Sequence, residues 1–121
     1  MSKERISVLV VEDEALVRMG IVDYLEDQGF RVFEAENAEG AIGLLATFPE
    51  ISVLFTDVDM PGAMDGFRLA AAVRDRWPPI EIIVTSGHAR GNPADLPDRA
   101  VFLSKPYDPQ LIAKTVRQLA L

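Results

Sequence analysis

Residues 51–59 read ISVLFTDVD, a short run of apolar and β-branched residues that ends in two acidic residues. An apolar run of this length is typical of a strand buried on both faces of a sheet. Similar runs stand at residues 6–11 (ISVLVV), 80–85 (IEIIVT) and 100–103 (AVFL), and residues 31–36 (RVFEAE) alternate as a strand does. The sequence therefore predicts five strands.

Helical patterns separate most of these strands. Apolar residues recur at helical spacing over residues 14–28, 38–48 and 66–76 and again after residue 108. Asn37, Asp65 and Asp108 stand where helix caps are expected, and Gly29 and Pro49 stand where the first two helices should end. The apolar positions of the first helix are Leu16, Met19, Ile21, Tyr24 and Leu25, and the buried stripe of the last is predicted at Leu111, Ile112, Val116 and Leu119.

The alternation of strands and helices predicts one α/β domain over residues 1–121. We expect a doubly wound, five-stranded parallel sheet, that is, a (βα)5 flavodoxin-like three-layer sandwich with helices on both faces. The fourth connection departs from the pattern because residues 87–99 (GHARGNPADLPDR) contain two prolines and few apolar residues. We expect a short or irregular fourth helix there, with residues 90–99 the most mobile part of the chain.

Composition excludes several classes of protein. The chain has 121 residues with no cysteine and one histidine, which excludes disulfides, cysteine nucleophiles and a multi-histidine zinc site. A net charge of −7 argues against direct nucleic-acid binding, which needs a basic face. No apolar run approaches the roughly 20 residues that span a bilayer, and the N-terminus lacks the apolar core of a signal peptide. We expect a cytoplasmic protein without a membrane segment.

Ionisable and hydroxyl side chains that could take part in chemistry follow four of the predicted strands. Glu12 and Asp13 follow the first strand, Asp57 ends the third, Ser86 follows the fourth and Lys105 follows the fifth. Because parallel strands point their carboxyl ends to one edge of the sheet, these side chains should meet there. Any one of them alone would more often be a cap, a turn residue or a solvated charge, so the prediction rests on the joint pattern.

The residue types in this cluster suit phosphoryl chemistry. Clustered carboxylates favour a hard cation, and Mg²⁺ is the natural candidate because it binds a few carboxylates together with water and phosphate oxygens. Lys105 adds a second positive centre, as the negative charge of a phosphoryl group requires. Asp57 would be the nucleophile that forms an acyl phosphate, and the Ser86 hydroxyl could donate a hydrogen bond to a phosphoryl oxygen.

The motifs together resemble the receiver domain of bacterial two-component response regulators, a chemotaxis-receiver-like fold. The resemblance spans about residues 5–120 and rests on VLVVEDE (8–14), FTDVDMPG (55–62), MDG (64–66), IIVTSGH (82–88) and FLSKPY (102–107). It implies that Asp57 is the phospho-acceptor and that Lys105 pairs with the phosphoryl group. It also implies that Glu12, Asp13, Asp57 and the backbone carbonyl of Asp59 hold Mg²⁺, and that the Lys105–Pro106 peptide bond is cis.

The resemblance further implies a phosphorelay switch. Ser86 and Phe102 would be its switch residues, the donor a sensor histidine kinase or phosphotransfer protein, and the output a downstream protein effector. Apart from Mg²⁺-dependent self-phosphorylation and self-dephosphorylation, no enzyme activity is expected. An extra residue in PGAMDG should bulge the loop after Asp57. The spacing from Ser86 to Lys105 is short for this family, so the dimer face common in the family, built on the fourth helix, fifth strand and fifth helix, should be incomplete. We therefore expect a monomer or a weak dimer, and His88 as a solvated loop residue near the site.

Three alternatives remain open at this point. LFTDVDM resembles the motif of haloacid-dehalogenase-type phosphatases, although there it should follow the first strand. A flavodoxin-like nucleotide-binding domain would need a phosphate-binding loop where this chain has the acidic VVEDEAL. A phosphorylation-independent interaction module would typically lack one of the acidic residues or the lysine.

Since the chain starts with Met1 just before the first strand, we favour a stand-alone receiver over an excised domain.

Overall fold

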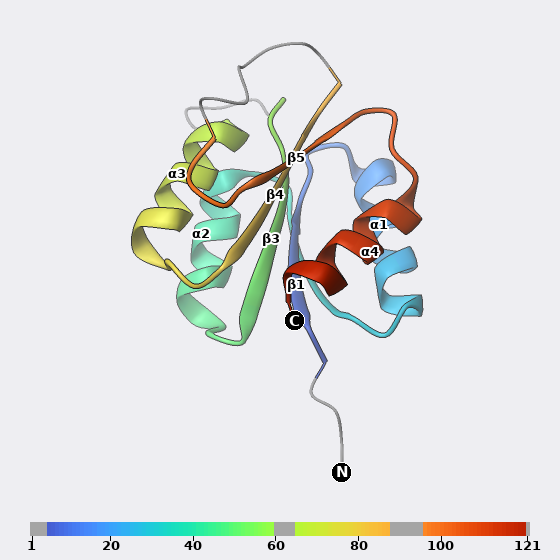
Figure 1. Cartoon of the computed structure of the whole chain (residues 1–121), viewed down its shortest axis with the longest axis horizontal. Coiled ribbons are helices and arrows are strands. Elements are labelled where there is room, and N and C mark those ends of the chain that lie inside the picture. The colour runs from blue at the N-terminus through green and yellow to red at the C-terminus, as the bar shows by residue number, and fades with distance from the viewer. Residues whose placement is uncertain (1–4, 60–64, 88–95, 121) are drawn as a thin grey trace.

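The computed structural model contains one sheet of five parallel strands in the order β2-β1-β3-β4-β5 (Figure 1). It describes residues 5–59, 65–87 and 96–120. The strands are β1 (Ser7–Val11), β2 (Arg31–Ala35), β3 (Ile51–Asp57), β4 (Glu81–Ser86) and β5 (Val101–Ser104). The helices are α1 (Ala15–Asp27), α2 (Ala38–Thr47), α3 (Gly66–Arg76) and α4 (Pro109–Leu119).

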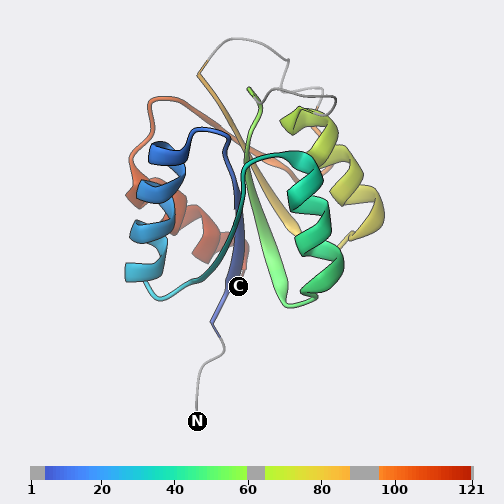
Figure 2. The ribbon, with the colours of Figure 1, turned by 180° about the vertical axis from the view of Figure 1, so that it is seen from behind.

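The helices form two layers, one on each face of the sheet. Helices α2 and α3 cover one face and α1 and α4 cover the other, as Figures 1 and 2 show from opposite sides. Each face has its own buried cluster, one containing Leu54, Leu69 and Ile82 and the other containing Leu25, Phe55 and Ile112. The predicted doubly wound, three-layer α/β fold is confirmed.

Local signals in the sequence set most helix boundaries. Asn37, Asp65 and Asp108 each accept a hydrogen bond from a backbone N–H in the first turn of α2, α3 and α4. Gly29 follows α1 with a φ of 94°, a conformation that glycine adopts without steric strain. Helix α1 differs, because its N-cap residue Glu14 makes no side-chain cap bond.

Three large apolar residues of the helical patterns face outward. Leu16 and Met19 of α1 are 79% and 56% exposed, and the prediction that Leu111 is buried is wrong, since it is 42% exposed. The cause is the rotation of each helix. The buried stripe of α1 passes through Ile21 and Leu25, and at roughly 100° per residue Leu16 and Met19 point away from it. An apolar residue at helical spacing thus indicates a helix without fixing its buried face.

Of the connection between β4 and β5, the structure describes Gly87 and residues 96–100. Residues 96–100 form a bend and a turn with no helix, closed by a hydrogen bond from the Ala100 N–H to the Pro97 carbonyl at 3.2 Å. Arg74 of α3 donates to the carbonyls of Asp98, Pro78 and Ile80 and so ties this turn to α3 and to the segment that precedes β4. The rest of the expected irregular segment, residues 88–95 with His88, lies outside the described residues, as does the expected bulge at 60–64.

Within the described ranges, no helix is both long and apolar enough to cross a membrane.

Gly66 brings the start of α3 against the end of β3. Its N–H donates to the Val58 carbonyl at 3.2 Å. A Cβ atom at this position would lie 2.2 Å from the backbone oxygen of Asp57 and 2.6 Å from the Cα of Val58. Both neighbours are backbone atoms, so only glycine fits without moving the end of the strand.

Substitution of Gly66 should therefore destabilise the chain. We expect Gly66→Ala to lower the free energy of unfolding by about 1–3 kcal/mol, the range typical of overpacking. Gly43→Ala is the matched control, because nothing lies within 4 Å of its added Cβ in α2 and alanine favours a helix by roughly 0.5–1 kcal/mol. Urea unfolding followed by circular dichroism measures both, and equal stability of the two variants would contradict the packing argument.

Candidate functional site

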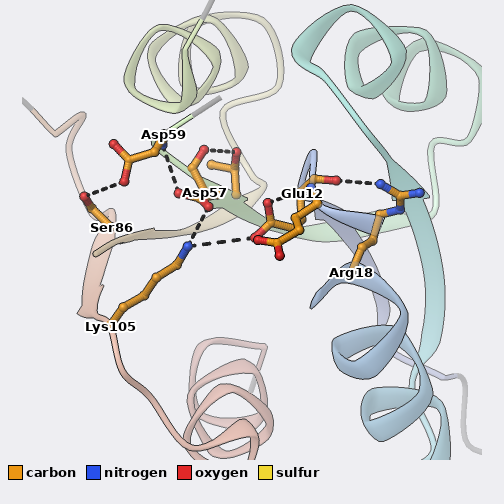
Figure 3. Close-up of polar contacts among 8 residues, drawn as sticks. Glu12, Arg18, Asp57, Asp59, Ser86 and Lys105 are labelled. Atoms are coloured by element: carbon orange, nitrogen blue, oxygen red, sulfur yellow. Dashed lines mark hydrogen bonds and ion pairs between the residues drawn. The ribbon is translucent and has the colours of Figure 1, made fainter. Parts of the chain in front are cut away.

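Four strands of the sheet deliver polar side chains to one edge (Figure 3). Glu12 directly follows β1, Asp57 and Ser86 are the last residues of β3 and β4, and Lys105 directly follows β5. Phe102 lies within β5, half-buried against the core on the α2 and α3 side of the sheet. The structure thus brings Glu12, Asp57 and Lys105 together as the strand order implies, since β1, β3, β4 and β5 are successive neighbours.

Three carboxylates meet at this edge. Glu12, Asp13 and Asp57 each offer an oxygen, and these oxygens lie within 4.8 Å of one another. The Glu12 and Asp57 residues are 2% and 3% exposed, whereas Asp13 is exposed to solvent. Such a set repels itself unless a cation offsets it.

Lys105 supplies one cation. Its Nζ atom lies 2.7 Å from Asp57 Oδ2 and 3.9 Å from Glu12 Oε1. Burial acts to lower the pKa of Lys105, but the hydrogen bond to Asp57 and the charges of Asp57 and Glu12 raise it above its ordinary value. The ammonium group therefore stays protonated and bound to Asp57.

The negative charge of Glu12 is only partly offset by Lys105, which lies closer to Asp57. Burial, its contact with Asp13 and the charge of Asp57 raise its pKa from 4.5 to about 7, against the opposing effects of the Glu14 N–H and Lys105. A divalent cation would remove this excess. Oxygen donors from carboxylates are what Mg²⁺ prefers, so the donor set fits that ion.

Asp59 connects the carboxylate cluster to Ser86. Its backbone N–H donates to Asp57 Oδ1 at 2.9 Å, and its own Oδ2 accepts a hydrogen bond from the Ser86 hydroxyl at 3.2 Å. Figure 3 shows Asp59 between Asp57 and Ser86. The predicted cis bond between Lys105 and Pro106 is present, and the role of the Asp59 carbonyl as a metal ligand stays a prediction.

Arg18 is a residue of this region that no sequence motif indicated. Its guanidinium donates to the backbone carbonyl of Glu12 at 2.7 Å and to Glu34 Oε1 at 2.9 Å. Glu34 lies on β2, so the contact joins residues 16 positions apart. The only sequence signal was a basic residue one turn into the helix that follows the acidic pair.

A doubly wound fold with an acidic cluster and a lysine at the carboxyl edge of the sheet defines a class of α/β domains suited to phosphoryl chemistry. Comparison with known families narrows it. Residues 8–117 match the response regulator receiver domain family, and the chain belongs to that family. It is a receiver domain of two-component response regulators, which act as signalling switches. This match favours the receiver interpretation over the phosphatase and nucleotide-binding alternatives.

Curated relatives place similar sequences in proteins of different size. The chain is 36% identical to the response regulator receiver protein CpdR of Brucella abortus over 103 residues, 83% of this chain and 84% of CpdR. It is 37% identical to the sensor kinase CckA of the same organism over 93% of this chain, but spans only 12% of CckA. It also spans 25% of the hydrogenase transcriptional regulatory protein HoxA of Cupriavidus necator, at 34% identity over 98% of this chain.

Solved structures agree with the fold. A response regulator receiver protein from Sinorhizobium medicae superposes with a TM-score of 0.86 at 30% identity, covering 96% of this chain and 94% of the other. The receiver domain of the hybrid histidine kinase CckA superposes with a TM-score of 0.79 at 31% identity, covering 95% and 99%.

The raised pKa of Glu12 makes stability depend on pH. In metal-free buffer, the folded state keeps the Glu12 proton to a higher pH than the unfolded state does. The free energy of unfolding of the chain should therefore fall as pH rises from about 4.5 to about 7. Glu12→Gln cannot ionise, so it should match the wild-type chain near pH 4.5 and exceed it in unfolding free energy at pH 8. Urea unfolding across this range measures the difference. Exposed Glu26→Gln controls for the loss of one charge, and a pH-independent difference between wild type and Glu12→Gln would refute the assignment.

Proposed function

We propose that Asp57 accepts a phosphoryl group in the cytoplasm from the phosphohistidine of a sensor histidine kinase or phosphotransfer protein. The observation that supports this most is the set of contacts around the Asp57 carboxylate at the end of β3. One oxygen lies 2.7 Å from Lys105 Nζ, and the other accepts a hydrogen bond from the Asp59 N–H at 2.9 Å. Glu12 and Asp13 lie beside it. Both oxygens of the nucleophile are thus oriented, one by a cation and the other by a backbone donor.

The proposed transfer uses groups that already surround Asp57. An Asp57 oxygen attacks the phosphorus of the donor, a new O–P bond forms, and the P–N bond breaks with its electrons returning to the imidazole. Lys105 then pairs with a phosphoryl oxygen in place of Asp57 Oδ2. Glu12, Asp13 and Asp57 would hold Mg²⁺, which when bound neutralises charge on the phosphoryl oxygens. Attack of water on the acyl phosphate later releases phosphate and restores Asp57.

The proposed signal passes through Ser86. Its hydroxyl donates to Asp59 in the unphosphorylated chain, and it would exchange that acceptor for a phosphoryl oxygen. Phe102, half-buried on the same side of the sheet, would follow this movement and change the surface offered to a downstream protein effector. We propose that residues 1–121 act in this way as one receiver unit, a monomer or weak dimer without direct contact to nucleic acid or membrane.

An apolar groove next to the site offers a docking surface for the phosphohistidine donor. The groove, of about 680 Å³, lies between α1 and the segment after β5, and its lining includes Leu16, Val17, Gly20, Lys105, Pro106 and Tyr107. Lys105 belongs to both the groove and the acidic site, so a partner seated there comes close to Asp57. The exposure of Leu16 and Met19, 79% and 56%, provides apolar area for such a contact.

Removal of the nucleophile tests the central proposal. Asp57→Asn keeps the shape of the side chain but lacks the attacking carboxylate, so phosphoryl labelling should be abolished while circular dichroism stays unchanged. Intact-protein mass spectrometry after incubation with a small phosphodonor and Mg²⁺ gives the readout, and exposed Asp27→Asn is the control that should label normally. Unlabelled wild-type protein would instead support a phosphorylation-independent interaction module, and labelling of Asp57→Asn would exclude Asp57 as acceptor.

The docking surface is tested by separating the donor from the chemistry. Leu16→Glu should slow transfer from an autophosphorylated histidine kinase that labels the wild-type chain by about fivefold or more, because loss of a side chain that anchors an interface costs over about 1 kcal/mol. Labelling by a small phosphodonor should not change, since the Leu16 side chain is 79% exposed on α1 and is not part of the acidic cluster. Leu111→Glu on α4, also an exposed leucine and not among the groove residues, is the matched control. Equal rates from the kinase for Leu16→Glu and wild type would exclude this surface.

A further inference from the structure

The turn that carries the metal-binding pair is not held by an ordinary helix cap. Among the helices that the structure describes, α1 alone has an N-cap residue without a side-chain cap bond. That residue, Glu14, instead donates its backbone N–H to Glu12 Oε2 at 3.2 Å. The Glu12 carboxylate therefore serves the turn as well as the site.

Arg18 holds the backbone of Glu12 from the side opposite Lys105. Its Nη1 donates to the Glu12 carbonyl at 2.7 Å and its Nε to Glu34 Oε1 at 2.9 Å, and its side chain is only 17% exposed. The Glu12 N–H donates to the Ala35 carbonyl at 3.1 Å. The main chain of Glu12 is thus tied to β2 twice, once directly and once through the guanidinium. Figure 3 shows Arg18 and Lys105 on opposite sides of Glu12.

We propose that Arg18 is a positioning residue of the Mg²⁺ pocket. By bridging the Glu12 carbonyl to Glu34, it fixes the turn through Asp13 so that both carboxylates of the turn face Asp57. This inference rests on the proposed function, since it concerns the same pocket. Lys105 offsets charge by direct contact with the carboxylates, whereas the guanidinium of Arg18 donates to a backbone carbonyl and to a glutamate outside the pocket.

The requirement for such a bridge follows from the ion. Mg²⁺ demands near-ideal octahedral geometry at about 2.0–2.1 Å, so a small displacement of the turn lowers its affinity. Groups that orient metal ligands without touching the metal typically change affinity by 10–100-fold when they are lost. A planar guanidinium suits the task because it reaches two acceptors at once in a fixed geometry.

The test is Arg18→Met, which keeps the aliphatic stem and loses both hydrogen bonds. Magnesium chloride is titrated into the metal-free chain, and the backbone amide signals of Glu12 and Asp13 are followed by NMR. We expect the dissociation constant to rise by about tenfold. Phosphoryl labelling by a small donor should recover to near the wild-type rate at saturating Mg²⁺, because Asp57 and Lys105 are unchanged. A loss of affinity without a loss of saturated rate separates positioning from a general loss of structure.

Two further variants grade the effect. Arg18→Lys keeps the charge but cannot reach both acceptors in the same geometry. Glu34→Gln keeps the hydrogen bond from Arg18 to the Glu12 carbonyl and weakens the contact of Arg18 with residue 34. Both should fall between wild type and Arg18→Met. Arg31 lies on the same strand as Glu34 and forms an ion pair with Glu50 at 3.4 Å. Arg31→Met removes this ion pair and should leave Mg²⁺ affinity unchanged.

The outcomes distinguish this inference from the proposed function. A folded Arg18→Met variant with wild-type Mg²⁺ affinity, or an equal loss in Arg31→Met, would overturn the role of Arg18 while wild-type labelling still supports the acceptor. If Arg18→Met does not fold, wild-type affinity in both Arg18→Lys and Glu34→Gln would overturn it. A wild-type chain that neither binds Mg²⁺ nor accepts a phosphoryl group would reject the proposed function itself, and the inference with it.

Discussion

Mutual repulsion among three carboxylates at one edge of the sheet is the constraint that organises this molecule. Their oxygens lie within 4.8 Å of one another, and two of the three residues are almost fully buried. In a region of low dielectric such a group must be offset by positive charge or by retained protons. The chain uses both, since Lys105 binds Asp57 at 2.7 Å and the pKa of Glu12 rises to about 7.

The fold makes this cluster possible because strand order and side-chain length match. Lys105 follows β5, which is separated from β3 by β4. Neighbouring strands lie roughly 4.8 Å apart, so a side chain must extend across most of two strand spacings to reach Asp57. A lysine can do so and a shorter cation could not. The same parallel arrangement puts Ser86 at the end of the intervening strand, where its hydroxyl meets Asp59.

The site is assembled within residues that match the receiver family, 8–117. No contact described for the acidic cluster lies outside that range. This self-contained construction is consistent with relatives of very different size, of which the chain spans between 12% and 84%. The residues that the proposed function uses, Asp57, Lys105 and Ser86, all lie within this matched range.

Local chemistry in the sequence was sufficient for the elements and for the identity of the clustered residues. Four apolar runs and one alternating segment predicted the five strands, and Asn37, Asp65 and Asp108 marked three helix starts, because capping and hydrophobic periodicity depend on residues close in the chain. The meeting of Glu12, Asp57 and Lys105 also followed, because all parallel strands point their carboxyl ends to one edge.

Only the tertiary structure decided the rotation of the helices and the contacts between distant segments. The outward position of Leu16 and Leu111 depends on which stripe of each helix meets the sheet, and a period of 3.6 residues leaves that choice open when apolar residues occupy more than one face. The contact of Arg18 with Glu34 and the approach of Gly66 to Asp57 depend on how strands twist and helices seat against them. Such contacts join residues of different secondary-structure elements, so no pattern within one element records them.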